Sequence, residues 1–271
     1  MTRNELNRLF ETLNLRGNHV IVHASLSSFG DVDGGANGVC TALVDAVGDG
    51  GTIVMPAFTC AETLSDPTAR RGVSPPRAVA YHPDLPVSAD IGIIAETFRH
   101  FPGVLRSSHP THSFTAWGRQ ARDVLSTQRD NNSLGPLKKL NVMQGHVLLL
   151  GVSSRDATAI HLAADRPGPL TLGRRIAVRV NAAGYDERVV LENIPGCSLA
   201  FGRLDEHLDP SKIRSAQLPH GTARKIPIRY VVQLATRLLD NDPTFFLCDS
   251  THCPTCGPRR NTLAATHPAN Y

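Results

Sequence analysis

The chain has 271 residues, 41% of them hydrophobic, so it can bury a sizeable core in one large domain or two small ones. Its formal charge of +4 is scattered along the chain and aromatic residues make up only 5%, which argues against a nucleic-acid-binding surface. No apolar run approaches the ~20 residues of a membrane span, and residues 1–17 have the pattern of an amphipathic polar helix instead of a signal peptide, so we expect a soluble, cytoplasmic protein.

The first recognisable unit is a strand, a loop, a helix and a second strand. Val20–His23 and Thr52–Met55 are short, β-branched apolar runs that predict buried strands. Between them Val39, Leu43 and Val47 recur at helical spacing, and glycines follow as a helix stop. We therefore expect two parallel neighbouring strands joined by a right-handed crossover.

The loop inside this unit has the composition of a ligand-binding turn. It holds serines and paired glycines just before the helix, namely Ser25, Ser27, Ser28, Gly34 and Gly35. Small side chains let backbone N–H groups approach a ligand closely, and a helix N-terminus favours phosphate. Such loops are more often plain tight turns, and this one matches neither the GxGxxG pattern nor a P-loop.

The rest of the chain predicts further helices and strands around the same sheet. Val147–Val152 is continuously apolar and predicts a fully buried strand. The remaining predictions are a functional loop at Cys60–Pro86, helices at Ala89–Phe98, Ala157–Ala164 and Pro227–Asp240, strands at Phe114–Trp117, Arg174–Val180 and Glu187–Leu191, and a loose tail at Arg259–Tyr271. Together they indicate an α/β fold: one domain with a mainly parallel central sheet, helices on both faces and a smaller antiparallel strand region.

Four side chains are candidates for chemistry. His161 follows a buried strand, near the carboxyl ends where open α/β sheets place their sites. Glu96 lies beside the apolar face of its helix, where a salt bridge is the ordinary role and a histidine partner the functional one. His109 and His112 flank Pro110, which breaks the helix that would align them as metal ligands, so we interpret both as loop residues that form hydrogen bonds.

The six cysteines do not suggest a disulfide framework. Four soft ligands nevertheless occur close together near the C-terminus: Cys248, His252, Cys253 and Cys256. Zinc is one interpretation, but the spacing matches no common finger and there is no second CxxC. We expect reduced thiols without metal in a C-terminal turn.

Several ordered motifs resemble the aminoglycoside 3-N-acetyltransferase family, also called the antibiotic N-acetyltransferases, whose fold differs from that of the GNAT acetyltransferases. They are HASLSSFGDVDGG, VGDGGTIVMPAFT, IGIIAETFRHFPGVLRSSHPTHSFTAWG, LGPLKKLNVMQGHVLLLGV and TAIHLAA, and they span His23 to about Phe201. The resemblance implies one antibiotic N-acetyltransferase domain over residues 1–271, with a core at about 5–247 and a cysteine-rich tail at 248–271.

The resemblance also implies a reaction, acetyl-CoA-dependent acylation of an amine, with the 3-amino group of aminoglycoside antibiotics as the specific acceptor and antibiotic resistance as the outcome. The partners are then CoA and a small-molecule amine, and the oligomeric state, monomer or homodimer, stays open. His161 falls on the family's catalytic histidine and would act as general base, with Glu96 as its partner. The CoA-binding role falls on Ser25, Ser27, Ser28, Gly34, Gly35 and Ser113, and the acceptor-binding role on His109 and Asp165.

One departure from the family pattern bears on the acceptor. The family's HxAE is here His161-Leu-Ala-Ala164, and Asp165 follows one place later, rotated by about 100° along a helix. With the positive net charge, this favours a narrower or different set of amines. Three alternatives therefore stay open: an acetyltransferase of a biosynthetic amine, a metal-dependent hydrolase that uses His109, His112 and His161, and an inactive CoA-binding protein.

Overall fold

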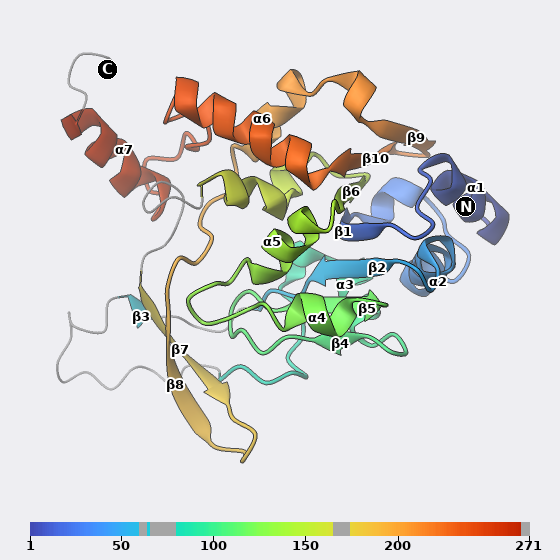
Figure 1. Ribbon diagram of the computed structural model, residues 1–271, viewed down its shortest axis with the longest axis horizontal. Coiled ribbons are helices and arrows are strands. Elements are labelled where there is room, and N and C mark those ends of the chain that lie inside the picture. The colour runs from blue at the N-terminus through green and yellow to red at the C-terminus, as the bar shows by residue number, and fades with distance from the viewer. Residues whose placement is uncertain (60–63, 66–79, 165–173, 267–271) are drawn as a thin grey trace.

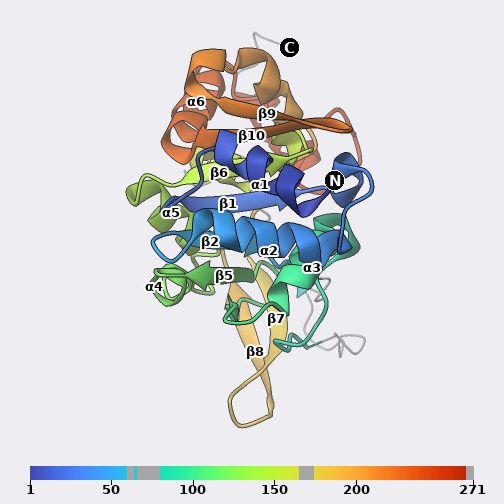
Figure 2. The same cartoon turned by 90° about the vertical axis from the view of Figure 1, so that its right-hand side faces the viewer.

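A seven-stranded mixed sheet forms the centre of the protein. The computed structural model describes residues 1–59, 64–65, 80–164 and 174–266. The strands follow the order β4-β5-β2-β1-β6-β10-β9, and Figure 2 shows most of them stacked in this order from bottom to top. Their bounds are β1 His19–Ala24, β2 Thr52–Pro56, β4 Leu105–Arg106, β5 Phe114–Gly118, β6 His146–Leu150, β9 Arg214–Leu218 and β10 Gly221–Pro227.

The three central strands are parallel and the flanking strands are antiparallel. β1 pairs in parallel with β2, with Val20 opposite Ile53, and with β6, with Ile21 opposite Val147. The predicted parallel pairing of β1 and β2 is therefore confirmed. The outer pairs β2–β5, β5–β4, β6–β10 and β10–β9 are all antiparallel.

Helices cover both faces of the sheet, as the sequence predicts. The α-helices are α1 Arg3–Thr12, α2 Gly35–Val47, α3 Ile93–Arg99, α4 Ala121–Leu125, α5 Gly135–Val142, α6 Ile228–Asn241 and α7 Cys256–Thr266. Short 3-10 helices are η1 Leu26–Phe29, η2 Ala89–Ile91, η3 Ser154–Asp156, η4 Thr158–Ala164, η5 Phe201–His207 and η6 Pro210–Lys212. One hydrophobic core joins α1, α2 and α3 to the sheet, and a second joins α4, α5, η4, α6 and the C-terminal segment to its other face.

A second, three-stranded antiparallel sheet projects from the body of the molecule (Figure 1). It consists of β3 Leu64–Ser65, β7 Arg175–Val180 and β8 Asp186–Leu191. The β7–β8 pairing confirms the hairpin expected from the sequence. Most of the loop expected at 60–86 lies outside the described residues.

The structure differs from the sequence-based expectations about elements in three places. The strands β9 and β10 were not anticipated, because β10 carries Arg224 and Lys225 in its middle, and charged residues argue against a buried strand. Lys225 is buried, but its ammonium donates hydrogen bonds to the Asn14 carbonyl at 2.6 Å and to Asn18 Oδ1 at 3.3 Å. The tail expected to be loose instead contains α7, which buries Leu263 in the second core.

The third concerns the helix expected at Ala89–Phe98. Gly92 has φ of +92°, which interrupts it, so a 3-10 turn precedes the separate helix α3.

Candidate active site

A cavity of about 570 Å³ opens at the carboxyl ends of the three parallel strands. It is the place where open α/β sheets bind their ligands, because loops diverge there. Its described lining comes from the ends of β1, β2 and β6, from the start of α3, from η4 and from the segment after β8.

His161 lies on η4 and lines this cavity, as the sequence predicts. Its ring is 7% exposed and packs edge-on against Phe201, with ring centroids 4.7 Å apart. The preceding loop is held by Ser154, whose backbone N–H and hydroxyl both donate to the carboxylate of Asp205. Burial lowers the pKa of His161 to about 4, so the ring is neutral at pH 7 and can accept a proton.

Two further histidines line the same cavity. His23 projects from β1, and burial lowers its pKa to about 3. His112 packs against Phe58 with ring centroids 4.6 Å apart, and burial with the neighbouring His109 and His161 holds its pKa well below the usual range. His23 was not singled out in the sequence, because a histidine within an apolar strand has no local signature.

The charged groups in the described lining are two carboxylates. Asp90 comes from η2 and Asp156 from η3, and no lysine or arginine lies among the described lining residues. Burial raises the pKa of Asp156, and the nearby Asp90 raises it further while Arg155 opposes both. The described lining therefore carries acidic side chains and no lysine or arginine, although the whole chain has a net positive charge, and these carboxylates suit a cationic ligand.

The serine loop divides into two parts. Ser25 and Ser27 line the cavity, and their hydroxyl oxygens lie 2.9 Å apart. Ser28 is instead buried, and its hydroxyl donates to the carbonyl of Gly151 at 2.9 Å, which ties η1 to the end of β6. Gly34 and Gly35 begin α2 outside the described lining; both have positive φ, and no side chain caps the helix there.

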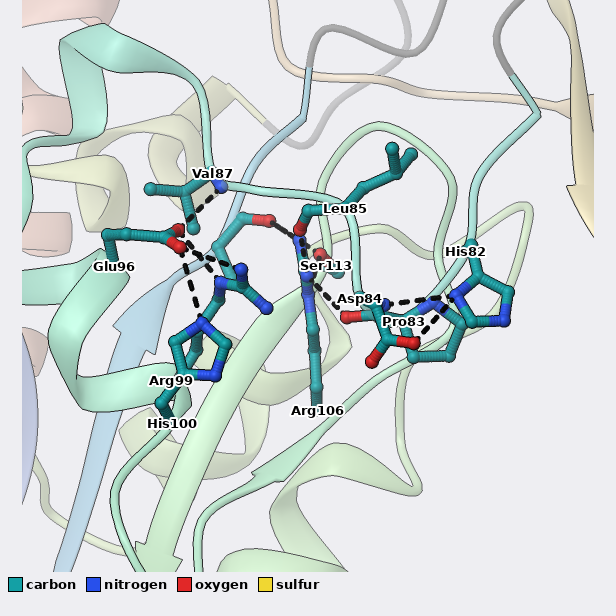
Figure 3. A network of polar contacts seen from close by, with 11 residues as sticks. His82, Pro83, Asp84, Leu85, Val87, Glu96, Arg99, His100, Arg106 and Ser113 are labelled. Atoms are coloured by element: carbon teal, nitrogen blue, oxygen red, sulfur yellow. Dashed lines mark hydrogen bonds and ion pairs between the residues drawn. The ribbon is translucent and has the colours of Figure 1, made fainter.

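Glu96 does not reach His161. Figure 3 shows its carboxylate directed at Arg99, His100 and the backbone of Val87. Burial raises the pKa of Glu96, but hydrogen bonds from Arg99 and the Val87 N–H outweigh that effect and hold it at about 2. The expected pairing of Glu96 with His161 is therefore wrong. Arg99, one helical turn further along α3, binds the Glu96 carboxylate instead.

Ser113 is also a structural residue in this fold. It is fully buried; its hydroxyl donates to the carbonyl of Ala57 at 2.6 Å and accepts from Arg106 Nε at 3.2 Å (Figure 3). Its expected contact with CoA stays a prediction.

Of the two expected acceptor-binding residues the structure describes His109 alone, and His109 lies outside the described lining of this cavity. His109 lines a separate cavity of about 520 Å³, together with Arg106, Arg122, Arg129 and Arg179. Its Nδ1 accepts from the His112 N–H at 3.1 Å, and its buried Nε2 has no partner among the described residues. Asp165 lies outside the described residues.

Three of the four expected soft ligands near the C-terminus do come together. The thiols of Cys248, Cys253 and Cys256 converge with that of Cys197, whereas His252 is exposed and not part of the group. Within the described part of the chain this is the sole convergent group of metal-binding side chains, so His109, His112 and His161 do not form the centre that a metal-dependent hydrolase would need.

The fold and the cavity together define an α/β protein whose ligand site contains a neutral histidine, small hydroxyl groups and carboxylates. No helix in the described ranges has the length and apolar character needed to cross a membrane. The family model described as aminoglycoside 3-N-acetyltransferase matches residues 21–240. The chain belongs to this family.

Individual relatives agree with this assignment. Aminoglycoside N(3)-acetyltransferase IV from Salmonella sp is 31% identical over 249 residues, covering 90% of this chain and 87% of that protein. The SPbeta prophage-derived aminoglycoside N(3')-acetyltransferase-like protein YokD from Bacillus subtilis is 40% identical over 166 residues, covering 56% of this chain and 60% of its own length.

Solved structures show the same fold. The apoenzyme of aminoglycoside acetyltransferase AAC(3)-IVa superimposes with a TM-score of 0.78 at 29% identity, covering 96% of both chains. AAC-IIIb, solved as a binary complex with CoASH, superimposes with a TM-score of 0.75 at 26% identity, covering 89% of this chain and 97% of that one.

Proposed function

We propose that this protein transfers the acetyl group of acetyl-CoA to the 3-amino group of an aminoglycoside, with His161 as the general base. The observation that carries the proposal is a buried, neutral His161 on a cavity whose described charged groups are two carboxylates. The relatives named as aminoglycoside N(3)-acetyltransferases support the acceptor, and the neighbour solved with CoASH supports the donor.

The chemistry requires a base because a protonated amine has no lone pair with which to attack a thioester. The neutral ring of His161 accepts one proton from the ammonium group, and the amine nitrogen so formed attacks the acetyl carbonyl and later gives up a second proton to the departing CoA thiolate. The C–N bond forms, the C–S bond breaks, and the CoA thiolate leaves and takes up a proton. The hydroxyls of Ser25 and Ser27 are the candidate donors to the oxyanion that develops on the carbonyl oxygen.

The acceptor is selected by charge. An aminoglycoside carries several ammonium groups, and Asp90 and Asp156 give the cavity the opposite sign. The positive net charge of the whole chain therefore does not decide which acceptor binds, because the local groups dominate within a Debye length of about 10 Å at 0.1 M salt.

The donor is expected beside the serine loop. Gly34 at the N-cap and Gly35 at the first position of α2 have no side chains, so a phosphate of CoA can approach the helix N-terminus there. Ser25 and Ser27 then connect this position to the cavity that holds His161.

A thiol-release assay with acetyl-CoA tests the function across a panel of aminoglycosides and simpler amines. We expect CoA release with aminoglycosides, and NMR of the product should place the acetyl group on the 3-amino nitrogen. Release with simple amines alone would contradict the aminoglycoside assignment and support a biosynthetic amine as the acceptor. Absence of release with every amine, despite CoA binding by calorimetry, would indicate an inactive CoA-binding protein.

A further inference from the structure

Four cysteine thiols gather at one point on the far side of the cavity wall. They come from three separate segments: Cys197 after β8, Cys248 after α6, and Cys253 with Cys256 at the start of α7. Their sulfur atoms all lie within 4.8 Å of one another. Cys248 and Cys256 are buried, and the other two are partly exposed.

This geometry is close to that of a tetrahedral thiolate site. With zinc–sulfur bonds of about 2.3 Å, the sulfur atoms of a tetrahedron lie about 3.8 Å apart. The four thiols therefore need only a small contraction to surround one ion. The two-residue spacing of Cys253 and Cys256 is also the spacing by which structural zinc sites take two ligands from one turn.

Backbone N–H groups already point at three of the sulfur atoms. The N–H of Leu199 donates to Cys197 Sγ, that of Cys256 to Cys253 Sγ, and that of Cys248 to Cys256 Sγ, each at 3.4 Å. Such bonds stabilise a thiolate more than a thiol, because the charged form is the stronger acceptor. Thiols that packed as small apolar groups would not need to direct all four sulfur atoms to one point.

The surrounding charges complement a metal–thiolate group. A divalent ion with four thiolates is net negative, and two arginines follow Cys256 on α7. Arg260 donates to the carbonyl of Cys248, and the buried Nε of Arg259 has no hydrogen-bond partner among the described residues. The N-terminus of the 11-residue helix α7 also lies at Cys256, where its dipole favours negative charge.

We propose that the sulfur atoms of Cys197, Cys248, Cys253 and Cys256 bind one structural zinc ion. Binding releases the four thiol protons to solvent and involves no change of oxidation state. Four protein ligands complete the tetrahedron, so the ion has no open position for a substrate and acts as a cross-link.

The cross-link would fasten the cavity wall to the C-terminal segment. Cys197 lies between Gly196 and Ser198, which both line the cavity. Four residues further on, Phe201 packs against His161 and against Phe246, with ring centroids 4.7 Å and 5.3 Å apart. Zinc bound to Cys197 would therefore restrain the segment around Gly196 and Ser198, which forms one wall of the cavity.

Metal analysis of the full chain, purified under reducing conditions without chelators, tests the proposal. We expect about one zinc per chain, and removal of the ion by a strong chelator should lower Tm. Cobalt(II) added to the stripped protein should give the strong visible bands and the thiolate charge-transfer absorption of a tetrahedral four-sulfur site. This cobalt measurement uses the wild-type chain, so it decides the question even if cysteine variants fail to fold.

Three variants identify the ligands. Cys197→Ser should lose zinc or bind it much more weakly. Cys40→Ser is the matched control, because Cys40 is a buried thiol outside the group, and it should retain the ion. His252→Ala should also retain it, since this exposed residue lies among the ligands in sequence only.

Several outcomes would overturn the proposal. Protein without metal that takes up neither zinc nor cobalt has no such site. Disulfides that persist among these four cysteines under the reducing conditions of purification would make the group a covalent cross-link instead. Loss of zinc in His252→Ala with retention in Cys197→Ser would replace the proposed ligand set.

Discussion

Burial keeps the proposed base, His161, in its neutral form. The ring lies in an apolar contact with Phe201, and its lowered pKa of about 4 keeps it neutral throughout the physiological range. At neutral pH the ring is therefore in its unprotonated form. At the same time a low pKa makes a weak base, so positioning must supply part of the catalysis.

We predict that His161→Ala lowers kcat by about 10²-fold or more, because general-base catalysis contributes about that factor. The KM for acetyl-CoA should change little, since the histidine acts on the amine. Because the base must be neutral, the wild-type rate falls as the pH drops through the His161 pKa of about 4, so this residue should give no break near pH 6.5. Steady-state kinetics over a range of pH values measures both effects.

His220→Ala provides the control, because His220 is exposed and outside the described lining of the cavity. Near-full activity of His161→Ala at pH 7 would show that the general-base role is wrong. The amine would then react after losing its proton to solvent, and the rate should keep rising towards the amine's own pKa.

At the scale of elements, α3 and the segment before it are joined by a polar network (Figure 3). Glu96 accepts hydrogen bonds from Arg99 Nε at 2.8 Å and from the Val87 N–H at 2.9 Å. Arg106 then binds the carbonyl of Pro83 at 2.7 Å and that of Ala57 at 2.9 Å. The network fixes the chain that leads into Asp90 and the cavity rim.

We predict that Glu96→Gln destabilises the protein by about 1–3 kcal/mol, because the arginine beside it loses its charged partner. The Arg99 side chain is only 9% exposed, so water does not readily replace the lost carboxylate. Urea unfolding measures the change in the free energy of unfolding.

Asp84→Asn is the matched control, since this carboxylate belongs to the same segment but its side chain is 89% exposed beside His82. We expect less than about 0.5 kcal/mol from it. If both variants had the same stability as the wild type, the network around Glu96 would contribute nothing measurable.

At the scale of the whole molecule, buried histidines make folding sensitive to acid. Burial lowers the pKa to about 3 for His23 and to about 4 for His109, His146 and His161. In the unfolded chain a histidine has a pKa of about 6.5. Between these pKa values the unfolded state binds more protons than the folded state, so the free energy of unfolding rises with pH. The contribution of these histidines to stability is therefore lost as the pH falls from about 6.5 towards 4.

We therefore predict markedly lower stability at about pH 5 than at about pH 7, with each such histidine contributing at most about 1.4 kcal/mol for each pH unit below about 6.5. The Glu96 carboxyl has a pKa of about 2, so its charge, and with it its contribution to stability, is lost below the pH range of this comparison. Urea unfolding at both pH values measures the difference.

His146→Gln should reduce that pH dependence, because glutamine cannot take up a proton and position 146 lies outside the described cavity lining. A dependence equal to that of the wild type would show that His146 is not titrating as its burial requires.

The sequence by itself determined the central crossover unit and the place of His161. Both follow from local patterns: the apolar runs of β1, β2 and β6 can only be buried strands, and a residue shortly after a buried parallel strand lies at its carboxyl end. The family motifs then led from that position to a reaction. These features depend on periodicity and chain order, which a sequence contains directly.

Only the tertiary structure decided which side chains meet. Glu96 binds Arg99, the hydroxyls of Ser28 and Ser113 donate to backbone carbonyls, and His109 lines a second cavity. Each polar group forms its contacts with the partner that packing brings nearest. Packing also brought Cys197 to thiols more than fifty positions away, and His23 to the cavity. Contacts between residues so far apart in the chain leave no local pattern, since they depend on how whole elements pack together.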